Sequence, residues 1–199
     1  MIVNYNNFFV EILKAIIKLC IAGLLIGLLK SFDLFIALIL ITKIIHVVFK
    51  NIITSKAKNW ILLYGMLLTS LAGMIGENWG VNNAYWEYHK VSRELPLWLP
   101  FAWMLAFYFL YSIESRLIHY LKFKTIKDKL ILAFWLSLLV PAFGEIITIN
   151  LGVWTYYWPY QLFGVPIYAF MCLVIVHMIV YGILAFICKK QKINDIVFT

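Results

Sequence analysis

The sequence contains GENWGVNNAYWEY at residues 76–88 and GEIITINLGVWTY at residues 144–156, and these two stretches decide how the rest is interpreted. Aligned without a gap, they agree at five positions, which hold Gly, Glu, Asn, Trp and Tyr. A proline that leads an apolar run follows each stretch, Pro96 in the first case and Pro166 in the second. Such agreement among rare residue types exceeds what composition explains and indicates an internal duplication.

The composition predicts an integral membrane protein. The chain has 199 residues, of which 64% are hydrophobic and 13% charged, and its mean hydropathy is +0.92. Soluble domains are about half apolar and about a quarter charged, so a soluble fold of this size could not bury so much apolar surface. The net charge of +8 does not indicate nucleic-acid binding, because the basic residues lie in short clusters between apolar runs.

Apolar runs long enough to cross a bilayer predict an all-α membrane protein with about six transmembrane helices. A span needs about 20 residues, and helices satisfy every backbone group within the span. We expect Pro96 and Pro166 in the first turn of their helices, a kink at Pro141, and close helix contact at Gly23 and Gly27. The expected helices are Phe8–Leu29, Phe32–Phe49, Trp60–Glu77, Pro96–Tyr120, Leu130–Asn150 and Val165–Cys188.

The predicted organisation is a single polytopic domain over residues 1–199. It consists of an N-terminal helical hairpin (1–58), a first two-helix repeat (60–121), a second repeat (129–188) and a cytoplasmic tail (189–199). Whether the hairpin is a third, diverged copy or a later addition stays open, because no motif in it decides. A second copy of the chain or another membrane protein are the candidate protein partners.

Lysine and arginine predict the orientation. Eleven lie on the side of residues 50–58, 116–129 and 189–192, and three, Lys30, Lys90 and Arg93, lie on the other. This excess predicts cytoplasmic termini, in a bacterial inner membrane. At 1.5 Å per residue, Glu77 lies about 25 Å beyond Trp60 and Glu145 about 24 Å beyond Lys129, so both carboxyls are expected near the outer interface.

Glu77 and Glu145 are the candidate catalytic residues. A carboxyl group in an apolar bundle is costly when ionised and usually faces a cavity. A neutral acid in a dry site can protonate a carbon–carbon double bond, and aromatic faces stabilise the positive charge that develops. The predicted binding residues around the two glutamates are Trp86, Tyr88, Trp154, Tyr156, Asn82, Asn150 and Trp103.

Simpler interpretations exist for the same residues. The glutamates could anchor irregular loops by accepting backbone N–H bonds, and part of the tryptophan and tyrosine set could form an interfacial belt. Glu114 could pair locally with Arg116, and His177 is expected to be buried and hydrogen-bonded. The four histidines and three cysteines form no metal motif, and no phosphate loop or nucleophile elbow is present, so no metal or cofactor is expected.

The run from Gly76 to Tyr88, followed by LPLWLPFAW at residues 95–103, resembles the membrane carotenoid-biosynthesis proteins, namely carotenoid hydratases and, more distantly, small-domain lycopene cyclases. The matching residues in the first copy are Glu77, Tyr88, Pro96, Pro100 and Trp103, and those in the second are Glu145, Gly152, Tyr156, Val165 and Pro166. The resemblance covers about half of the chain. It implies acid–base chemistry on a polyene or isoprenoid lipid without a redox cofactor.

The leading hypothesis is therefore a membrane enzyme, a lyase or isomerase, that acts on an isoprenoid or related lipid by glutamate protonation. Hydration, cyclisation and double-bond isomerisation each fit. The alternative is a non-enzymatic module, either a lipid-binding or carrier protein or a small subunit of a larger complex.

Overall fold

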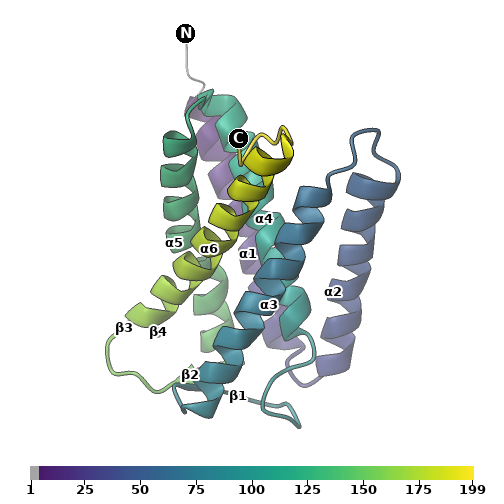
Figure 1. Ribbon diagram of the computed structural model, residues 1–199. Helices are drawn as coiled ribbons and strands as arrows, with labels where there is room; N and C mark the ends of the chain where they lie inside the picture. Colours follow the sequence, from purple (N-terminus) through teal and green to yellow (C-terminus); the bar gives the residue numbers. More distant parts are fainter. Residues whose placement is uncertain (1–4) are drawn as a thin grey trace.

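The computed structural model describes residues 5–199 and is all-helical apart from four short strands (Figure 1). The elements are α1 (Tyr5–Leu28), α2 (Asp33–Val48), a π-helical turn η1 (Phe49–Ile53), α3 (Trp60–Asn82), β1 (Trp86–Tyr88), α4 (Leu99–Leu121), α5 (Ile126–Asn150), β2 (Trp154–Tyr156), β3 (Gln161–Leu162), β4 (Val165–Pro166) and α6 (Ile167–Gln191). The helices run alternately up and down, so the start of α1 and the C terminus lie at one end and the β1–β2 pair at the other (Figure 1).

Four of these helices, within the described residues, are long and apolar enough to cross a membrane. They are α2 with η1 (Asp33–Ile53), α3, α5 and α6. Their outward sides carry large exposed apolar side chains, including Leu38, Ile45, Leu71, Ile75, Leu139, Ile175 and Ile183. So broad an apolar surface indicates an apolar solvent around the bundle, as the composition predicts.

Helix α4 is the centre of the bundle. It packs against α1, α2, α3 and α5, and Phe107, Ile113 and Leu117 of its inner surface are at most 1% exposed. On one side Phe107 packs with Met66 of α3 and Tyr181 of α6. Every neighbouring helix is therefore positioned relative to α4.

The charged residues of α4 have different partners from the one expected. Glu114 does not pair with Arg116; its Oε1 lies 2.7 Å from His177 Nε2 on α6, and both residues are buried, as predicted for His177. Arg116 instead reaches Glu11 on α1, with 2.7 Å between Nε and Oε2. Side chains two positions apart on a helix do not face each other, so Glu114 and Arg116 cannot form the expected local pair.

Several element boundaries differ from the prediction. Pro96 and Pro166 precede their helices, which begin at Leu99 and Ile167, and it is Pro100 that occupies the first turn of α4. Helix α3 continues past Glu77 to Asn82, and the short strands were not predicted, because three-residue pairings carry no periodic signal. Pro141 lies inside α5, as expected.

Helices α3 and α5 end in the same way. In α3, the backbone N–H groups of Asn83, Ala84 and Tyr85 donate to Trp79, Val81 and Gly80. In α5, those of Leu151, Gly152 and Val153 donate to Ile147, Ile149 and Thr148. Ala84 and Gly152 both adopt left-handed backbone, with φ of 55° and 67°. Every one of these positions corresponds in the gap-free alignment of the two stretches.

The strands that follow these turns pair with each other. β1 and β2 are antiparallel, and their register sets Trp86 opposite Tyr156, Glu87 opposite Thr155 and Tyr88 opposite Trp154. The hydrogen bonds of this pair join the two stretches, which lie 68 positions apart in the sequence. The end of α3 is thereby fixed beside the end of α5.

Gly23 and Gly27 bring α1 against α5, which confirms the predicted close contact. A Cβ on Gly27 would lie 2.2 Å from Leu151 Cδ1 and 2.7 Å from Leu151 Cβ, and one on Gly23 would lie 3.0 Å from the Gly144 carbonyl oxygen.

We expect Gly27→Ala to lower stability by about 1–3 kcal/mol through overpacking, measured as a lower melting temperature in detergent. Gly182→Ala is the matched control, since nothing lies within 4 Å of its Cβ; an equal loss there would contradict the packing explanation.

Candidate functional site

Glu77 is the most fully hydrogen-bonded side chain at the strand-bearing end of the bundle. Its Oε2 accepts bonds from Tyr88 OH at 2.8 Å and from Trp86 Nε1 at 3.0 Å, and its Oε1 accepts one from Trp103 Nε1 at 3.2 Å. The donors come from β1 and α4, so one carboxyl group connects three elements. Three donors and no acceptor is the environment that an ionised carboxylate requires, because it can only accept.

Two glycines of α3 make room for the tryptophans that bind Glu77. A Cβ on Gly73 would lie 2.2 Å from the Trp103 ring, and one on Gly80 would lie 1.8 Å from the Trp86 ring. Indole rings therefore lie directly on the α3 backbone, one turn above and one turn below the carboxyl group. The glycines are part of the site because only a missing side chain permits this approach.

Glu145 occupies the corresponding position on α5 but has fewer partners. Its Oε2 accepts one hydrogen bond, from Tyr156 OH at 3.3 Å. Each glutamate is thus bonded to the tyrosine eleven residues further along the chain. The Trp154 Nε1 is buried without an acceptor in the described structure, whereas Trp86, its counterpart, donates to Glu77.

Both glutamates line one cavity of about 580 Å³, which is within the roughly 300–1,000 Å³ range of small-molecule sites. Most of its wall is apolar and aromatic. The lining residues are Lys18, Leu19, Ala22, Gly23 and Ile26 of α1, Leu40 and Lys43 of α2, Glu77, Tyr88, Trp98, Leu99, Ala102, Trp103, Leu105, Ala106, Tyr108, Phe109, Ser112 and Arg116, then Pro141, Gly144, Glu145, Thr148, Trp154, Tyr156 and Leu173.

The cavity opens between α1 and α2. Among its lining residues only Lys18, Ala22 and Lys43 are exposed, and all three belong to these two helices. The glutamates lie at the inner end, where the side chains are only partly exposed. This opening gives a ligand a route to the carboxyl groups from the side of the bundle.

The aromatic rings around the glutamates form two matching pairs. Trp86 and Tyr156 lie 5.7 Å apart with an interplanar angle of 66°, and Tyr88 and Trp154 lie 5.6 Å apart at 60°. Burial, together with the carboxyl charge of Glu77, raises the pKa of the Tyr88 phenol well above its ordinary value, and burial beside Glu145 does the same for Tyr156. Both phenols therefore stay protonated and remain donors to the carboxyl groups.

Six of the nine predicted site residues line the cavity: Glu77, Glu145, Tyr88, Trp154, Tyr156 and Trp103. Trp86 binds Glu77 from outside the cavity wall. The two asparagines do not line the cavity. Asn150 is exposed and donates to Ile146 O of its own helix at 2.7 Å, and exposed Asn82 lies on a separate shallow groove along α3.

Sequence reasoning missed the basic residues of the site. Lys18 and Lys43 were not among the predicted site residues, and Arg116 was expected in a local pair with Glu114, yet all three line the cavity. The available signal was a charged residue inside each of three apolar runs, one of the strongest indicators of function in a membrane helix. Within residues 5–199, no group of three His, Cys, Asp or Glu side chains is arranged to hold a metal ion.

Comparison with known proteins yields no relative: the sequence matches no protein-family model and no curated protein, and the structure matches no solved structure. The function must therefore be argued from the site itself.

The glycines of α3 give a direct test of the site. We expect Gly80→Ala and Gly73→Ala to displace Trp86 and Trp103 from Glu77, with a loss of about 1–3 kcal/mol in stability and a changed near-UV circular dichroism spectrum. Gly76→Ala is the control on the same helix, because nothing lies within 4 Å of its Cβ. If all three variants behave alike, the tryptophans are not held by this close approach.

Proposed function

We propose that this protein is a membrane enzyme that acts on an isoprenoid or polyene lipid by acid–base chemistry between Glu77 and Glu145. One observation carries the proposal: two carboxyl groups from different helices line a single, largely aromatic cavity. A pair of carboxyl groups in unlike environments is the usual arrangement for one acid and one base. The resemblance of residues 76–103 to carotenoid hydratases and lycopene cyclases points to the same class of substrate.

The hydrogen bonds suggest which glutamate has which role. Glu77, with three donors, suits the ionised base, and Glu145, with a single 3.3 Å bond, suits the protonated acid. Glu145 gives its proton to one carbon of a double bond, whose π electrons form the new C–H bond. The neighbouring carbon becomes a cation, and the aromatic rings lining the cavity stabilise it.

The cation can be resolved in three ways that conserve atoms and charge. Water can add to it while Glu77 takes the released proton, which is hydration. Glu77 can remove a proton from an adjacent carbon, which moves the double bond. A second double bond can attack the cation before that proton is removed, which closes a ring. In each case the pair as a whole keeps its single negative charge, and proton exchange returns the acid to Glu145.

We also propose that α3–α4 and α5–α6 are duplicated units related by a two-fold axis. The register of β1 and β2 supports this, because a two-fold axis that passes midway between Glu87 and Thr155, perpendicular to the strand pair, exchanges Trp86 with Trp154 and Tyr88 with Tyr156. The matching helix ends and the matching Glu–Tyr bonds support it as well. The two glutamates would then be equivalent in origin and different in present role.

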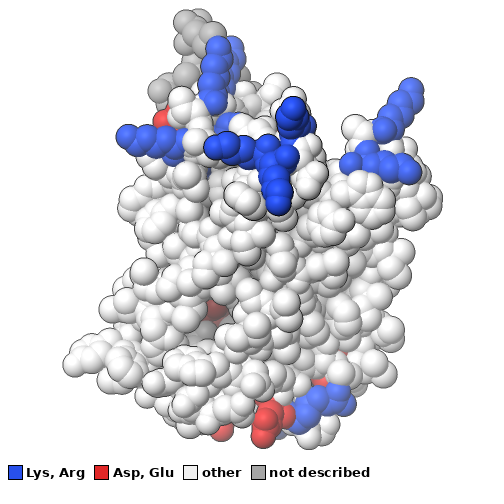
Figure 2. Space-filling model, viewed as in Figure 1, with Lys and Arg blue, Asp and Glu red and all other residues white. Residues whose placement is uncertain are grey.

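All six helices cross the membrane in this proposal, with the termini in the cytoplasm of a bacterial cell. Helices α1 and α4 are not among the four most clearly apolar spans, and two of their internal acids pair with residues of other helices, in Glu11–Arg116 and Glu114–His177. Figure 2 supports the orientation: on the side viewed, lysine and arginine gather at the end that carries the C terminus, and few lie at the opposite end. An excess of Lys and Arg is typical of the cytoplasmic end of a membrane protein and supports the proposed orientation.

The enzyme proposal predicts that Glu77→Gln and Glu145→Gln each lower turnover of a polyene or isoprenoid substrate by at least about 10²-fold, because glutamine keeps the shape and cannot transfer a proton. The measurement is product formation by the purified protein in lipid nanodiscs. Glu87→Gln is the matched control, since Glu87 lies between Trp86 and Tyr88 but is exposed and outside the cavity. Full activity in both variants would instead support a lipid-binding module.

The orientation predicts that cysteines introduced at Lys90 and Lys127 react from opposite sides of the membrane. A membrane-impermeant maleimide should label Lys90→Cys in intact cells and Lys127→Cys only after permeabilisation. The native cysteines are first replaced by serine, since Cys172 is exposed. Labelling of both sites from the same side would contradict the six-span topology.

A further inference from the structure

The charged residues that line the cavity are ordered by height. Measured along the helices at 1.5 Å per residue, Glu77 and Glu145 lie about 8 Å from the ends of α3 and α5, at the strand-bearing end. Lys18 and Lys43 each lie ten residues from the turn that joins α1 and α2, or about 15 Å. Arg116 lies seventeen residues beyond Leu99, or about 25 Å. The cavity is therefore acidic at its inner end and basic at its other end.

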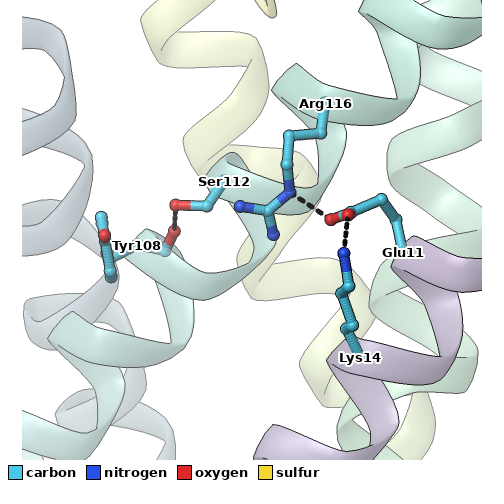
Figure 3. Close-up of polar contacts among 5 residues, drawn as sticks. All are labelled: Glu11, Lys14, Tyr108, Ser112 and Arg116. Carbon is cyan, nitrogen blue, oxygen red and sulfur yellow. Dashed lines mark hydrogen bonds and ion pairs between the residues drawn. The ribbon is translucent and has the colours of Figure 1, made fainter. Parts of the chain in front are cut away.

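Arg116 has donors available on its cavity side. Its Nε pairs with Glu11, which also binds Lys14 at 3.0 Å. Figure 3 shows Nε of Arg116 facing Glu11, one terminal nitrogen on the side of Ser112, and the other terminal nitrogen pointing away from both. Ser112 also lines the cavity, but its hydroxyl already donates to Tyr108 O at 2.6 Å. The guanidinium is thus fixed at one edge by an acid and presents its other edge to the ligand space.

The positive charge at this end is not balanced by the protein. Within residues 5–199, neither Lys18 nor Lys43 forms an ion pair within 4 Å. Lys18 interacts electrostatically with Glu11, but Glu11 is already paired with Lys14 and Arg116. Three basic side chains therefore line the cavity, whereas Glu11 is already shared between Lys14 and Arg116. Unpaired charges on helices inside a membrane are costly and are retained where a ligand or pathway uses them. A negatively charged ligand would supply the missing counter-charge.

We propose that the cavity binds an amphipathic lipid with a phosphate head group, held by Arg116, Lys18 and Lys43, with its apolar tail extending to Glu77 and Glu145. Arginine binds phosphate through parallel N–H bonds, and flexible lysines add point charge beside it. Along α4, thirteen residues separate Trp103, which touches Glu77, from Arg116, which is about 20 Å and enough for a tail of several isoprene units. That the tail is isoprenoid rests on the proposed function; the charged head group rests on the basic residues alone.

The proposal is tested by comparing lipids that differ only in the head group. The purified protein in phosphatidylcholine nanodiscs is titrated with geranylgeranyl monophosphate, with geranylgeraniol and with inorganic phosphate, and tryptophan fluorescence reports binding. We expect the phosphate lipid to bind at least about 10-fold more tightly than the alcohol, as charge-assisted hydrogen bonds allow. Equal affinity for the two lipids would overturn the proposal. So would inorganic phosphate binding as tightly as the phosphate lipid, since the ligand would then be a soluble anion.

Matched variants assign the effect to the cavity. Arg116→Gln is expected to remove most of the preference for phosphate and to leave binding of the alcohol unchanged. Lys14→Gln is the control, because Lys14 shares Glu11 with Arg116 but does not line the cavity, and it should keep the preference. A preference that survives Arg116→Gln, or that is lost equally in Lys14→Gln, would overturn the assignment. Lys18→Gln with Lys43→Gln provides a second variant if Arg116→Gln does not fold.

The proposal of a head-group site and the proposal of an acid–base site can be refuted independently of each other. Glu77→Gln should keep the preference for phosphate even though it is expected to abolish turnover. Loss of the preference in that variant would count against a distinct head-group site. Conversely, turnover that depends on Glu77 and Glu145, with no preference between phosphate and alcohol, would leave the enzyme proposal standing and refute the charged head group.

Discussion

The need to satisfy the hydrogen bonds of one buried carboxyl group inside an apolar bundle organises this molecule. Glu77 can be ionised in such a setting only if protein donors replace water, and three of them converge on it from β1 and α4. These hydrogen bonds hold β1 and α4 against α3. The indoles of Trp103 and Trp86 lie directly on the α3 backbone, so only glycine fits at positions 73 and 80. The shape of the cavity follows, because Tyr88 and Trp103 form its wall as well as binding the acid.

The two repeated stretches have nearly the same backbone structure, but their glutamates have different hydrogen-bond partners. The two helix ends, the two Glu–Tyr bonds and the two Trp–Tyr ring pairs agree closely. The difference lies in the indoles, since Trp86 and Trp103 donate to Glu77 while Trp154 leaves its nitrogen without an acceptor. Two acids in similar frameworks but unequal hydrogen-bonding environments are well placed to divide the tasks of giving and taking a proton.

Much of this could be predicted from the sequence, and the rest could not for identifiable reasons. Apolar runs predicted the helices, and the two repeated stretches predicted that Tyr88 and Tyr156 lie around the glutamates, where both donate hydrogen bonds to them. The sequence did not show that the asparagines lie outside the cavity, because a repeated residue can also serve a helix end, where Asn150 donates to Ile146 O. Lys18, Lys43 and Arg116 belong to three separate runs and share no motif, so only the packing of α1 and α2 on α4 reveals that they line one space.

The opening of the cavity between α1 and α2 determines the phase from which a ligand arrives. Its exposed rim, formed by Lys18, Ala22 and Lys43, lies on two helices whose outer surfaces are apolar, so in a membrane a ligand that enters there would come from the bilayer rather than from water. Encounter is then a two-dimensional process, and occupancy follows the mole fraction of the ligand among the lipids instead of its aqueous concentration. A molecule too polar to partition into the bilayer is excluded before it reaches any contact in the site, so selection begins in the membrane itself.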